Sequence, residues 1–358
     1  MDLADAIAAF PPPRATKTAI AVPDGTRPVD VSAALLALRP YVNDAVVIVG
    51  LGLHRPMRRE ELPTSPFPLV QHDADDTIPT GLVDGIEGRV SAHVHGCDVI
   101  LGVGIVELHQ YAGFSGGHKA VSVGLGGRSV IDALHHRDRV TAPGVELGRL
   151  DGNPFRSTVD KLGEAAGCAW TLLTTGPRWF AGSPRSALID AAGSLDCWIH
   201  VPRRYPAAIL RVPTRKAANF YQASRAATYL ALSPAPPLVD GATLYLDAAC
   251  PEGMGEGSGE QAFTEILSHS RPPFGELLSG PAPTSGGTQR AIMLALTLRR
   301  FRLVVCGVHD VTPFRRAGIE ATTEPADSVA PADRLEVCDP FGRIPILTVP
   351  ISPPAPSR

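Results

Sequence analysis

Short apolar segments alternate with amphipathic segments along most of the chain. TAIAVP (18–23) and AVVIVG (45–50) have the length and composition of buried strands, and SAALLALRPYV (32–42) between them has the apolar spacing of a helix. Two strands joined through a helix form a β-α-β unit, which places both strands parallel in one sheet. The alternation therefore predicts an α/β protein built on parallel sheets.

The alternation runs in two series that meet near residues 195–205. We therefore predict two α/β domains, residues 1–200 and 201–358, of which the first is a Rossmann-like parallel sheet. The active site is expected in the cleft between the domains. Further elements are expected at 97–106 (strand), 128–140 (helix), 157–175 (helix, then strand), 207–212 (strand), 219–233 (helix) and 242–248 (strand).

Polar side chains follow three of the predicted strands. Ligands of open α/β sheets bind outside the carboxyl ends of the strands, so residues far apart in the sequence are expected to meet in one crevice. Each residue alone has a structural explanation, such as an aspartate in a turn, but their occurrence after three strands favours a site. These residues are Asp24 and Arg27 after the first strand, His54 and Arg55 after the second, and His109 and Lys119 after the third.

The segment AGFSGGHKAVSVGLGG (112–127) contains six glycines and one lysine, Lys119. Glycine-rich loops bind phosphate groups through backbone N–H groups. A P-loop reads G-x-x-x-x-G-K-[ST], but here His118 stands where the second glycine belongs and Ala120 where the hydroxyl belongs. The dinucleotide fingerprint G-x-G-x-x-G also fails, at its last position, in GVGIVE and GLGLHR. The loop is therefore neither an ATPase loop nor a standard NAD loop.

The composition argues against several kinds of partner. A net charge of −3 gives no electrostatic reason to expect nucleic acid. No apolar run approaches the roughly 18–20 residues of a membrane span, and the first residues lack the pattern of a signal peptide. The six cysteines are scattered without a C-x-x-C pair, which is typical of reduced thiols. We therefore predict a cytoplasmic protein that acts on a small molecule.

Two histidine pairs require interpretation. His93 and His95 have the i, i+2 spacing that places two side chains on one face of a strand, as in metal-dependent hydrolases. A zinc hydrolase is therefore an alternative function, although no supporting set of carboxylates and histidines is evident. His135 and His136 are adjacent in a predicted helix, so at most one of them faces the crevice.

Together these residues resemble the nickel-pincer lactate racemase family, over roughly residues 18 to 265. The resemblance rests on the motifs after each strand and on two intervals around Lys119. His109 lies ten residues before it, and a histidine lies sixteen residues after it. The second interval selects His135 over His136. The matching residues are Asp24 and Arg27, Gly52, His54 and Arg55, His109, Lys119, His135, and the Tyr221-Gln222-x-x-Arg225 motif.

The resemblance implies a cofactor and its binding residues. Lys119 would be covalently attached, through a thioamide, to a nickel-pincer nucleotide (pyridinium-3,5-bisthiocarboxylic acid mononucleotide). The ring carbon and two sulfurs of this group would bind nickel, with His135 as the fourth ligand. Separate biosynthetic proteins would supply the cofactor, as partners in maturation. The other residues expected to bind the cofactor are Ser115, Gly116, Gly117 and Tyr221.

The resemblance also implies a reaction, the racemisation or epimerisation of a 2-hydroxy acid. The pyridinium would accept hydride from the substrate, and a 2-keto acid would take it back on its other face. His54 and His109 are expected as the acid/base pair, one for each enantiomer. The residues expected to bind substrate are Arg27 as a carboxylate clamp, Asp24 as an orienting group, Gln222 and Arg225. The alternatives are another hydride-based isomerisation, or a protein that only binds the cofactor.

The chain departs from the family pattern at several positions. Arg225 stands where the family usually has lysine, and Val123 where it has proline. The segment VPTRKAAN (212–219) adds Arg215 and Lys216 before the Tyr-Gln helix. These cations would either recognise a second carboxylate or a phosphate on the substrate, or lie on a solvated face. The identity of the 2-hydroxy acid and the oligomeric state are therefore left open.

Overall fold

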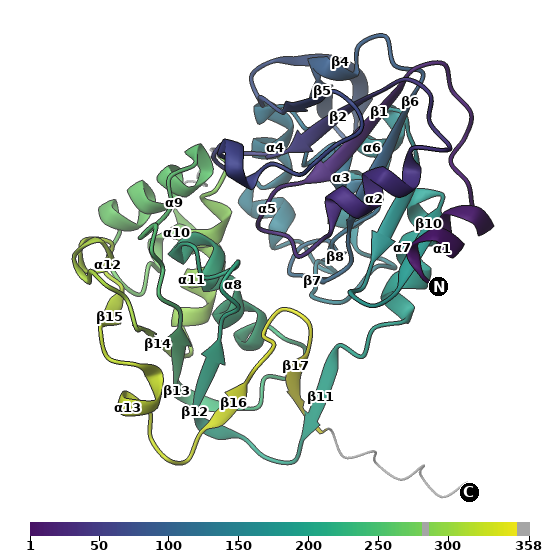
Figure 1. Cartoon of the computed structure of the whole chain (residues 1–358). Coiled ribbons are helices and arrows are strands. Elements are labelled where there is room, and N and C mark those ends of the chain that lie inside the picture. Colours follow the sequence, from purple (N-terminus) through teal and green to yellow (C-terminus); the bar gives the residue numbers. More distant parts are fainter. Residues whose placement is uncertain (281–285, 349–358) are drawn as a thin grey trace, which may run out of the picture.

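The computed structural model describes residues 1–280 and 286–348, in which most strands belong to two sheets (Figure 1). The first sheet has six strands in the order β10-β9-β6-β1-β2-β3. Neighbouring strands are parallel except β10, which is antiparallel to β9. Their bounds are β1 Thr18–Pro23, β2 Ala45–Gly50, β3 Leu69–Gln71, β6 Val99–Ile105, β9 Cys168–Thr174 and β10 Trp179–Gly182.

Strand β1 lies at the centre of this sheet, with β2 on one side and β6 on the other. The chain therefore fills one half of the sheet and then the other, and a crevice opens where the order reverses. The strand ends are nearly level, because Pro23 pairs with Gly50 and Ala21 with Gly102. Residues that follow β1, β2 and β6 consequently meet above the same edge.

Helices cover both faces of the first sheet. On one face, α1 (Leu3–Ala9) and α2 (Val31–Leu38) pack on β1, β2 and β6. The Asp30 side chain accepts from the Ala33 N–H and caps α2, which buries Ala34 and Leu35. The other helices of this half are α3 Lys119–Ser122, α4 Arg128–Leu134, α5 Arg137–Val140, α6 Pro154–Ala165 and α7 Pro184–Gly193.

The second sheet has five parallel strands in the order β15-β14-β13-β12-β16. Its order also reverses, at β12. The strands are β12 Tyr205–Arg211, β13 Leu238–Asp247, β14 Arg302–Cys306, β15 Glu320–Thr322 and β16 Leu335–Val337. The helices are α8 Phe220–Ala231, α9 Ser258–His269, α10 Glu276–Ser279, α11 Gln289–Leu298, α12 Thr312–Arg316 and α13 Ala326–Val329.

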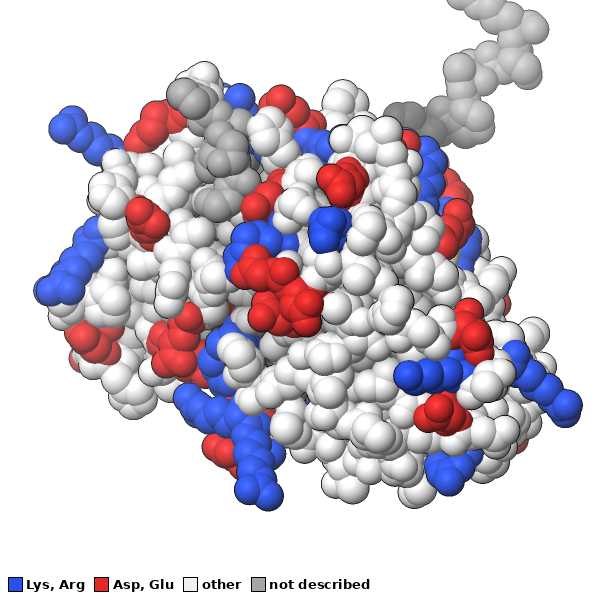
Figure 2. All heavy atoms as spheres, turned by 90° about the horizontal axis from the view of Figure 1, so that it is seen from above, with Lys and Arg blue, Asp and Glu red and all other residues white. Residues whose placement is uncertain are grey.

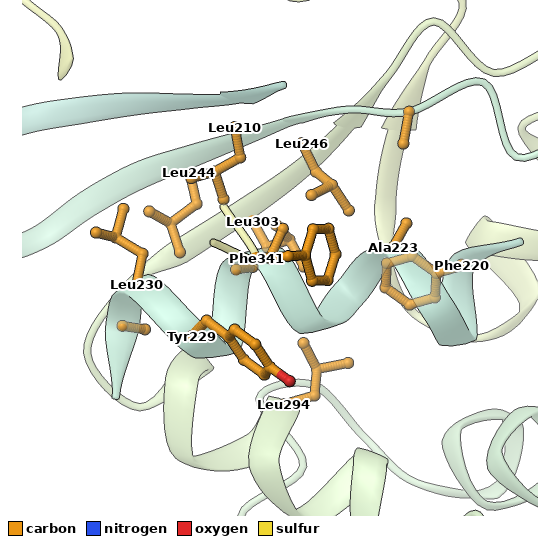
Figure 3. Close-up of a cluster of buried hydrophobic side chains, with 14 of the residues drawn as sticks. Leu210, Phe220, Ala223, Tyr229, Leu230, Leu244, Leu246, Leu294, Leu303 and Phe341 are labelled. Carbon is orange, nitrogen blue, oxygen red and sulfur yellow. The ribbon is translucent and has the colours of Figure 1, made fainter. Parts of the chain in front are cut away.

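Helix α8 is buried on all sides. Leu210 and Leu244 of the sheet contact one side of it, and Leu294 of α11 lies on the other (Figure 3). The apolar core continues into the first half of the chain, since Ile292 of α11 belongs to one cluster with Phe155 of α6. This packing fixes α8 and α11 relative to the first sheet, which matters because both helices contribute to the site below.

A two-stranded parallel pair, β11 (Trp198–Val201) with β17 (Ile344–Leu347), lies where the chain passes from one sheet to the other (Figure 1). The mixed α/β fold predicted from the sequence is confirmed. The domain boundary between residues 200 and 201 stays a prediction. Unpredicted strands include the β4–β5 hairpin (Thr77–Val83 and Ile86–Ser91) and the pair β7–β8 (Leu108–His109 and Gly113–Phe114).

Two local predictions are wrong. The helix expected at 128–140 is two helices, because the His135 ring donates to the Ile131 carbonyl at 2.8 Å and its backbone leaves the helical conformation. His93 and His95 do not share a strand face, since they lie in and after a 3-10 turn (Ala92–Val94) and are exposed. Among the described residues, no group of three or more histidine, cysteine or carboxylate side chains is arranged to hold a metal ion.

The surface carries charges of both signs. On the face in Figure 2, acidic and basic side chains are interspersed, without a continuous band of one sign. No helix in residues 1–280 or 286–348 is long and apolar enough to cross a membrane.

The central packing around α8 predicts a large effect of a single truncation. Leu244 is fully buried, and replacing it by alanine should lower the free energy of unfolding by about 2–5 kcal/mol, through lost burial and a cavity. Urea denaturation measures the change. Leu36→Ala is the matched control, because Leu36 is 68% exposed and the same substitution there should cost less than about 0.5 kcal/mol. Equal losses would contradict the assignment of Leu244 to the core.

Candidate active site

One cavity opens at the carboxyl edge of the first sheet, beneath α8 and α11. Two of the residues predicted for the site do not line the cavity: Arg55 pairs with Glu61 and Glu252, and Gly117 packs on α7 next to Leu188. Residues from both halves of the chain thus meet around a single space. The predicted residues that line it are Asp24, Arg27, His54, His109, Ser115, Gly116, Lys119, His135, Tyr221, Gln222 and Arg225.

Asp24 and His54 form a hydrogen-bonded pair. The Nδ1 of His54 lies 2.6 Å from Oδ2 of Asp24, and the Thr26 hydroxyl donates to the other carboxylate oxygen at 2.5 Å. Burial alone would raise the pKa of Asp24, but the charge of His54, followed by the hydrogen bonds from His54 and Thr26, outweighs burial and lowers that pKa. A charged carboxylate next to Nδ1 keeps the proton of the His54 ring on that nitrogen. Nε2 then carries a free lone pair and can act as a base.

Gln222 and Arg225 act on His54 from α8. The Arg225 guanidinium donates to the Gln222 side-chain oxygen, and because a guanidinium only donates, the amide nitrogen must point the other way. That nitrogen donates to Nε2 of His54 at 3.0 Å. Both residues thus fix the ring and tautomer of His54, and their expected role in substrate binding stays a prediction.

His109 has the opposite tautomer. Its Nδ1 accepts from the backbone N–H groups of Tyr111 and Ala112, at 3.3 and 3.2 Å. The neutral ring consequently carries its proton on Nε2. Burial, followed by the charges of Lys119 and Arg27, holds the pKa of His109 well below its usual range. His109 is therefore a neutral N–H donor to the cavity, whereas His54 is an acceptor.

Lys119 begins α3 and is partly accessible from the cavity. Its amine has no hydrogen-bond or ion-pair partner among the residues that the structure describes. Burial, followed by the charges of Arg27 and Arg156, lowers the pKa of Lys119 well below the usual value for lysine. A lowered pKa increases the fraction of the amine that is neutral and nucleophilic, so Lys119 can form a covalent bond to a ligand.

His135 presents a free ring nitrogen to the same cavity. Its Nδ1–H donates to the Ile131 carbonyl, which leaves Nε2 as a lone pair. Burial lowers the pKa of His135 to about 4, although the Ile131 bond opposes it. A neutral histidine held through one nitrogen and open at the other is the usual form of a metal ligand. His136 instead caps α5, where its ring accepts from the Asp138 N–H.

The glycine loop is held in place by Arg156, which the sequence analysis missed. This fully buried side chain donates to the carbonyls of Phe114 and Gly116, each at 3.2 Å, and pairs with Asp160 at 3.0 Å. The Ser115 hydroxyl donates to the Ile105 carbonyl at 2.7 Å and ties the loop to the end of β6. Ser115 therefore lines the cavity, but its hydroxyl serves to hold the loop in place.

Arg27 has a carboxylate partner within the protein. Glu107 accepts from Arg27 at 3.2 Å and from Lys216 at 2.9 Å. Lys216 is only 3% exposed, so it does not lie on a solvated face, and burial lowers its pKa to about 7. Arg215 is exposed and donates to the Arg27 carbonyl. The cations of 212–219 thus support Arg27 and Glu107 instead of forming a separate surface.

Comparison with known proteins gives one family. The lactate racemase N-terminal domain family matches residues 12–148. The lactate racemase of Lactiplantibacillus plantarum is 32% identical over 151 aligned residues, which cover 36% of this chain and 35% of that protein. The aligned region therefore spans about a third of the length of this relative.

Two solved structures share the fold over nearly the whole chain. The lactate racemase apoprotein from Thermoanaerobacterium thermosaccharolyticum has a TM-score of 0.77 at 17% identity, and the match covers 96% of this chain and 91% of that one. A protein from Thermotoga maritima has a TM-score of 0.70 at 15% identity, with 97% and 96% covered. Residues 12–148 thus match the lactate racemase N-terminal domain family, and nearly the whole chain shares the fold of these two structures.

Proposed function

We propose that the protein racemises or epimerises a 2-hydroxy acid with a nickel-pincer nucleotide covalently attached to Lys119. The observation that carries this proposal is the amine of Lys119, which has no partner in the described part of the chain and lies in one cavity with His135 and the Asp24–His54 pair. A nucleophilic amine, a neutral imidazole with a free nitrogen and a general base are three groups that this chemistry requires.

The residues of the cavity fit the proposed cofactor. Lys119 would hold it covalently, His135 would supply a nickel ligand through Nε2, and Tyr221 would line its pocket. Glycines form much of the wall, including Gly104, Gly116 and Gly124, which lets a flat ligand approach the backbone. When bound, the group would supply a pyridinium that accepts hydride from the substrate carbon and returns it.

The protein's own residues would handle the hydroxyl proton. The substrate hydroxyl would replace the Gln222 amide at Nε2 of His54, and His54 would take the proton as hydride leaves. The charged Asp24 would stabilise the imidazolium. His109 would donate its Nε2–H to the substrate oxygen, so the pair has unequal roles in place of the symmetric roles expected from the sequence.

Two further expectations belong with this proposal. The six cysteines are all unpaired, which supports the predicted cytoplasmic location. The proteins that make the cofactor would be partners in maturation.

Of the alternatives, a protein that only binds the cofactor would not need a base, and the organised Asp24–His54 pair therefore favours turnover. The exposed positions of His93 and His95 give a zinc hydrolase no support.

Covalent attachment can be tested by intact mass. Protein produced together with the cofactor-making enzymes should carry a nucleotide-sized adduct and nickel, and it should racemise a 2-hydroxy acid. Lys119→Ala should lose the adduct, whereas Lys17→Ala, at an exposed lysine, should keep it. His135→Ala should keep the adduct and lose nickel. An unmodified wild-type chain, under conditions that load another family member, would refute the proposal.

The amine of Lys119 can be tested without cofactor, because the chain has only four lysines, Lys17, Lys119, Lys161 and Lys216. Cyanate reacts with neutral amines, and a lowered pKa means that the neutral fraction of Lys119 saturates at lower pH. Its carbamylation rate, followed by peptide mapping from about pH 6 to pH 10, should level off well before those of the exposed Lys17 and Lys161. Parallel profiles for the three would argue against a nucleophilic Lys119.

The unequal roles of the two histidines predict different tolerance to substitution. In the loaded enzyme, His54→Gln removes the base and should lower kcat by about 10²–10⁴-fold. His109→Gln keeps an N–H donor and should retain more activity than His109→Phe, which loses about 10²–10³-fold. Polarimetry measures all three. Similar losses for His109→Gln and His109→Phe would mean that His109 acts as a second base after all.

A further inference from the structure

Arg290 of α11 is a buried cation without a counter-ion among the residues that the structure describes. It is 6% exposed, and its Nε and Nη1 have no hydrogen-bond partner among the described residues. No described carboxylate pairs with it, and the adjacent segment PAPTS (281–285) contains no acidic residue. An unpaired buried guanidinium destabilises a fold by several kcal/mol, so its presence requires a reason.

The side chain of Arg290 is held between two aromatic rings that line the cavity. Its guanidinium carbon lies 5.4 Å from the ring centre of Tyr221 and 6.0 Å from that of Tyr111. The Tyr111 hydroxyl is also buried without a partner. Donors of two side chains are therefore unsatisfied at one side of the cavity, and both suit an anionic group.

Arg225 is a second buried cation that pairs with no carboxylate in residues 1–280 or 286–348. It is 2% exposed and its hydrogen bonds go to the neutral Gln222. Burial, followed by the charges of Arg290 and Arg27, lowers the pKa of Arg225 to about 10, as expected for neighbouring cations. Tyr221 and Arg225 are one helical turn apart on α8, so Arg290 over Tyr221 lies beside Arg225 on the same face.

The carboxylates of the site do not balance these cations. Asp24 is paired with His54, and Glu107 is shared by Arg27 and Lys216. A monocarboxylate bound near His54 would serve Arg225 and leave Arg290 unpaired. Because Gln222 links Arg225 directly to His54, this end of the cavity is where the reacting part of a substrate lies, in contrast to a cofactor phosphate, which a ribose separates from the ring.

We propose that the substrate is a 2-hydroxy dicarboxylic acid, whose first carboxylate binds Arg225 and whose second binds Arg290 and the Tyr111 hydroxyl. This inference rests on the proposed function, and it names the substrate class of the same site. A dicarboxylate also suits a site with one base. If the keto acid turns about its C=O bond, its other face is exposed and its two ends exchange places. The keto oxygen then stays beside His54, and each carboxylate again lies next to a guanidinium.

Binding to the protein without cofactor tests Arg290 directly. The midpoint of thermal unfolding should rise more with sodium malate than with sodium lactate at equal ionic strength, and Arg290→Met should abolish the difference. Without ligand, Arg290→Met should unfold at the same or a higher temperature, because it removes an unpaired charge. Arg156→Met is the matched control, since Arg156 is equally buried but fully paired, and that variant should unfold at a lower temperature.

The loaded enzyme gives the second test. Malate should be racemised, and Arg290→Met should lower the ratio of kcat/KM for malate over lactate by about 10²-fold. Racemisation of lactate but not malate would overturn this inference and leave the proposed function standing. Loss of the nucleotide adduct in Arg290→Met would assign Arg290 to the cofactor phosphate and also overturn it. A loaded enzyme inactive on both acids would refute the proposed function, and the thermal comparison would still decide whether Arg290 binds a dicarboxylate.

Discussion

A directed run of hydrogen bonds connects the two halves of the molecule through the cavity. Arg225 can only donate, so it orients the Gln222 amide, which donates to His54, whose other nitrogen donates to Asp24. Arg225 sets the direction of every hydrogen bond in the series, and the series ends at the buried carboxylate of Asp24. The protonation state of the base on the first sheet therefore depends on a helix of the second sheet, and the site is complete only when both are in place.

The excess of positive charge in the cavity has consequences beyond ligand binding. The charges of Arg27 and Arg290 lie close enough to act on the pKa values of both His109 and Lys119, after burial, and they favour the neutral forms. The cations that would attract an anionic substrate thereby also favour the neutral forms of Lys119 and His109. The proposed recognition of an anion and the lowered pKa of Lys119 therefore share one contribution in addition to burial, the shortage of carboxylates around these side chains.

The sequence predicted the fold class and brought most of the site together, because alternation and strand-end position both follow from parallel-sheet geometry. It could not predict the tautomers of His54 and His109, which depend on which neighbours donate and which accept. The sequence also contains no sign of the role of Arg290, because an arginine in the amphipathic segment of α11 looks like an ordinary helix residue. What distinguishes Arg290 is that its Nε and Nη1 have no partner among the described residues. Partners that are distant in sequence, such as Glu107 for Lys216, leave no local signal.

The arginine at position 225, which departs from the family's usual lysine, gains a physical explanation from these contacts. A lysine ammonium is a compact charge that can rotate, whereas a guanidinium is a planar fork with five N–H donors. Arg225 uses two of its nitrogens on Gln222, one on the side-chain oxygen and one on the backbone carbonyl. The planar group thus orients the amide that sets the tautomer of His54 and keeps further donors for a carboxylate. In the proposed mechanism, this one residue would join the control of the base to the recognition of an anionic substrate.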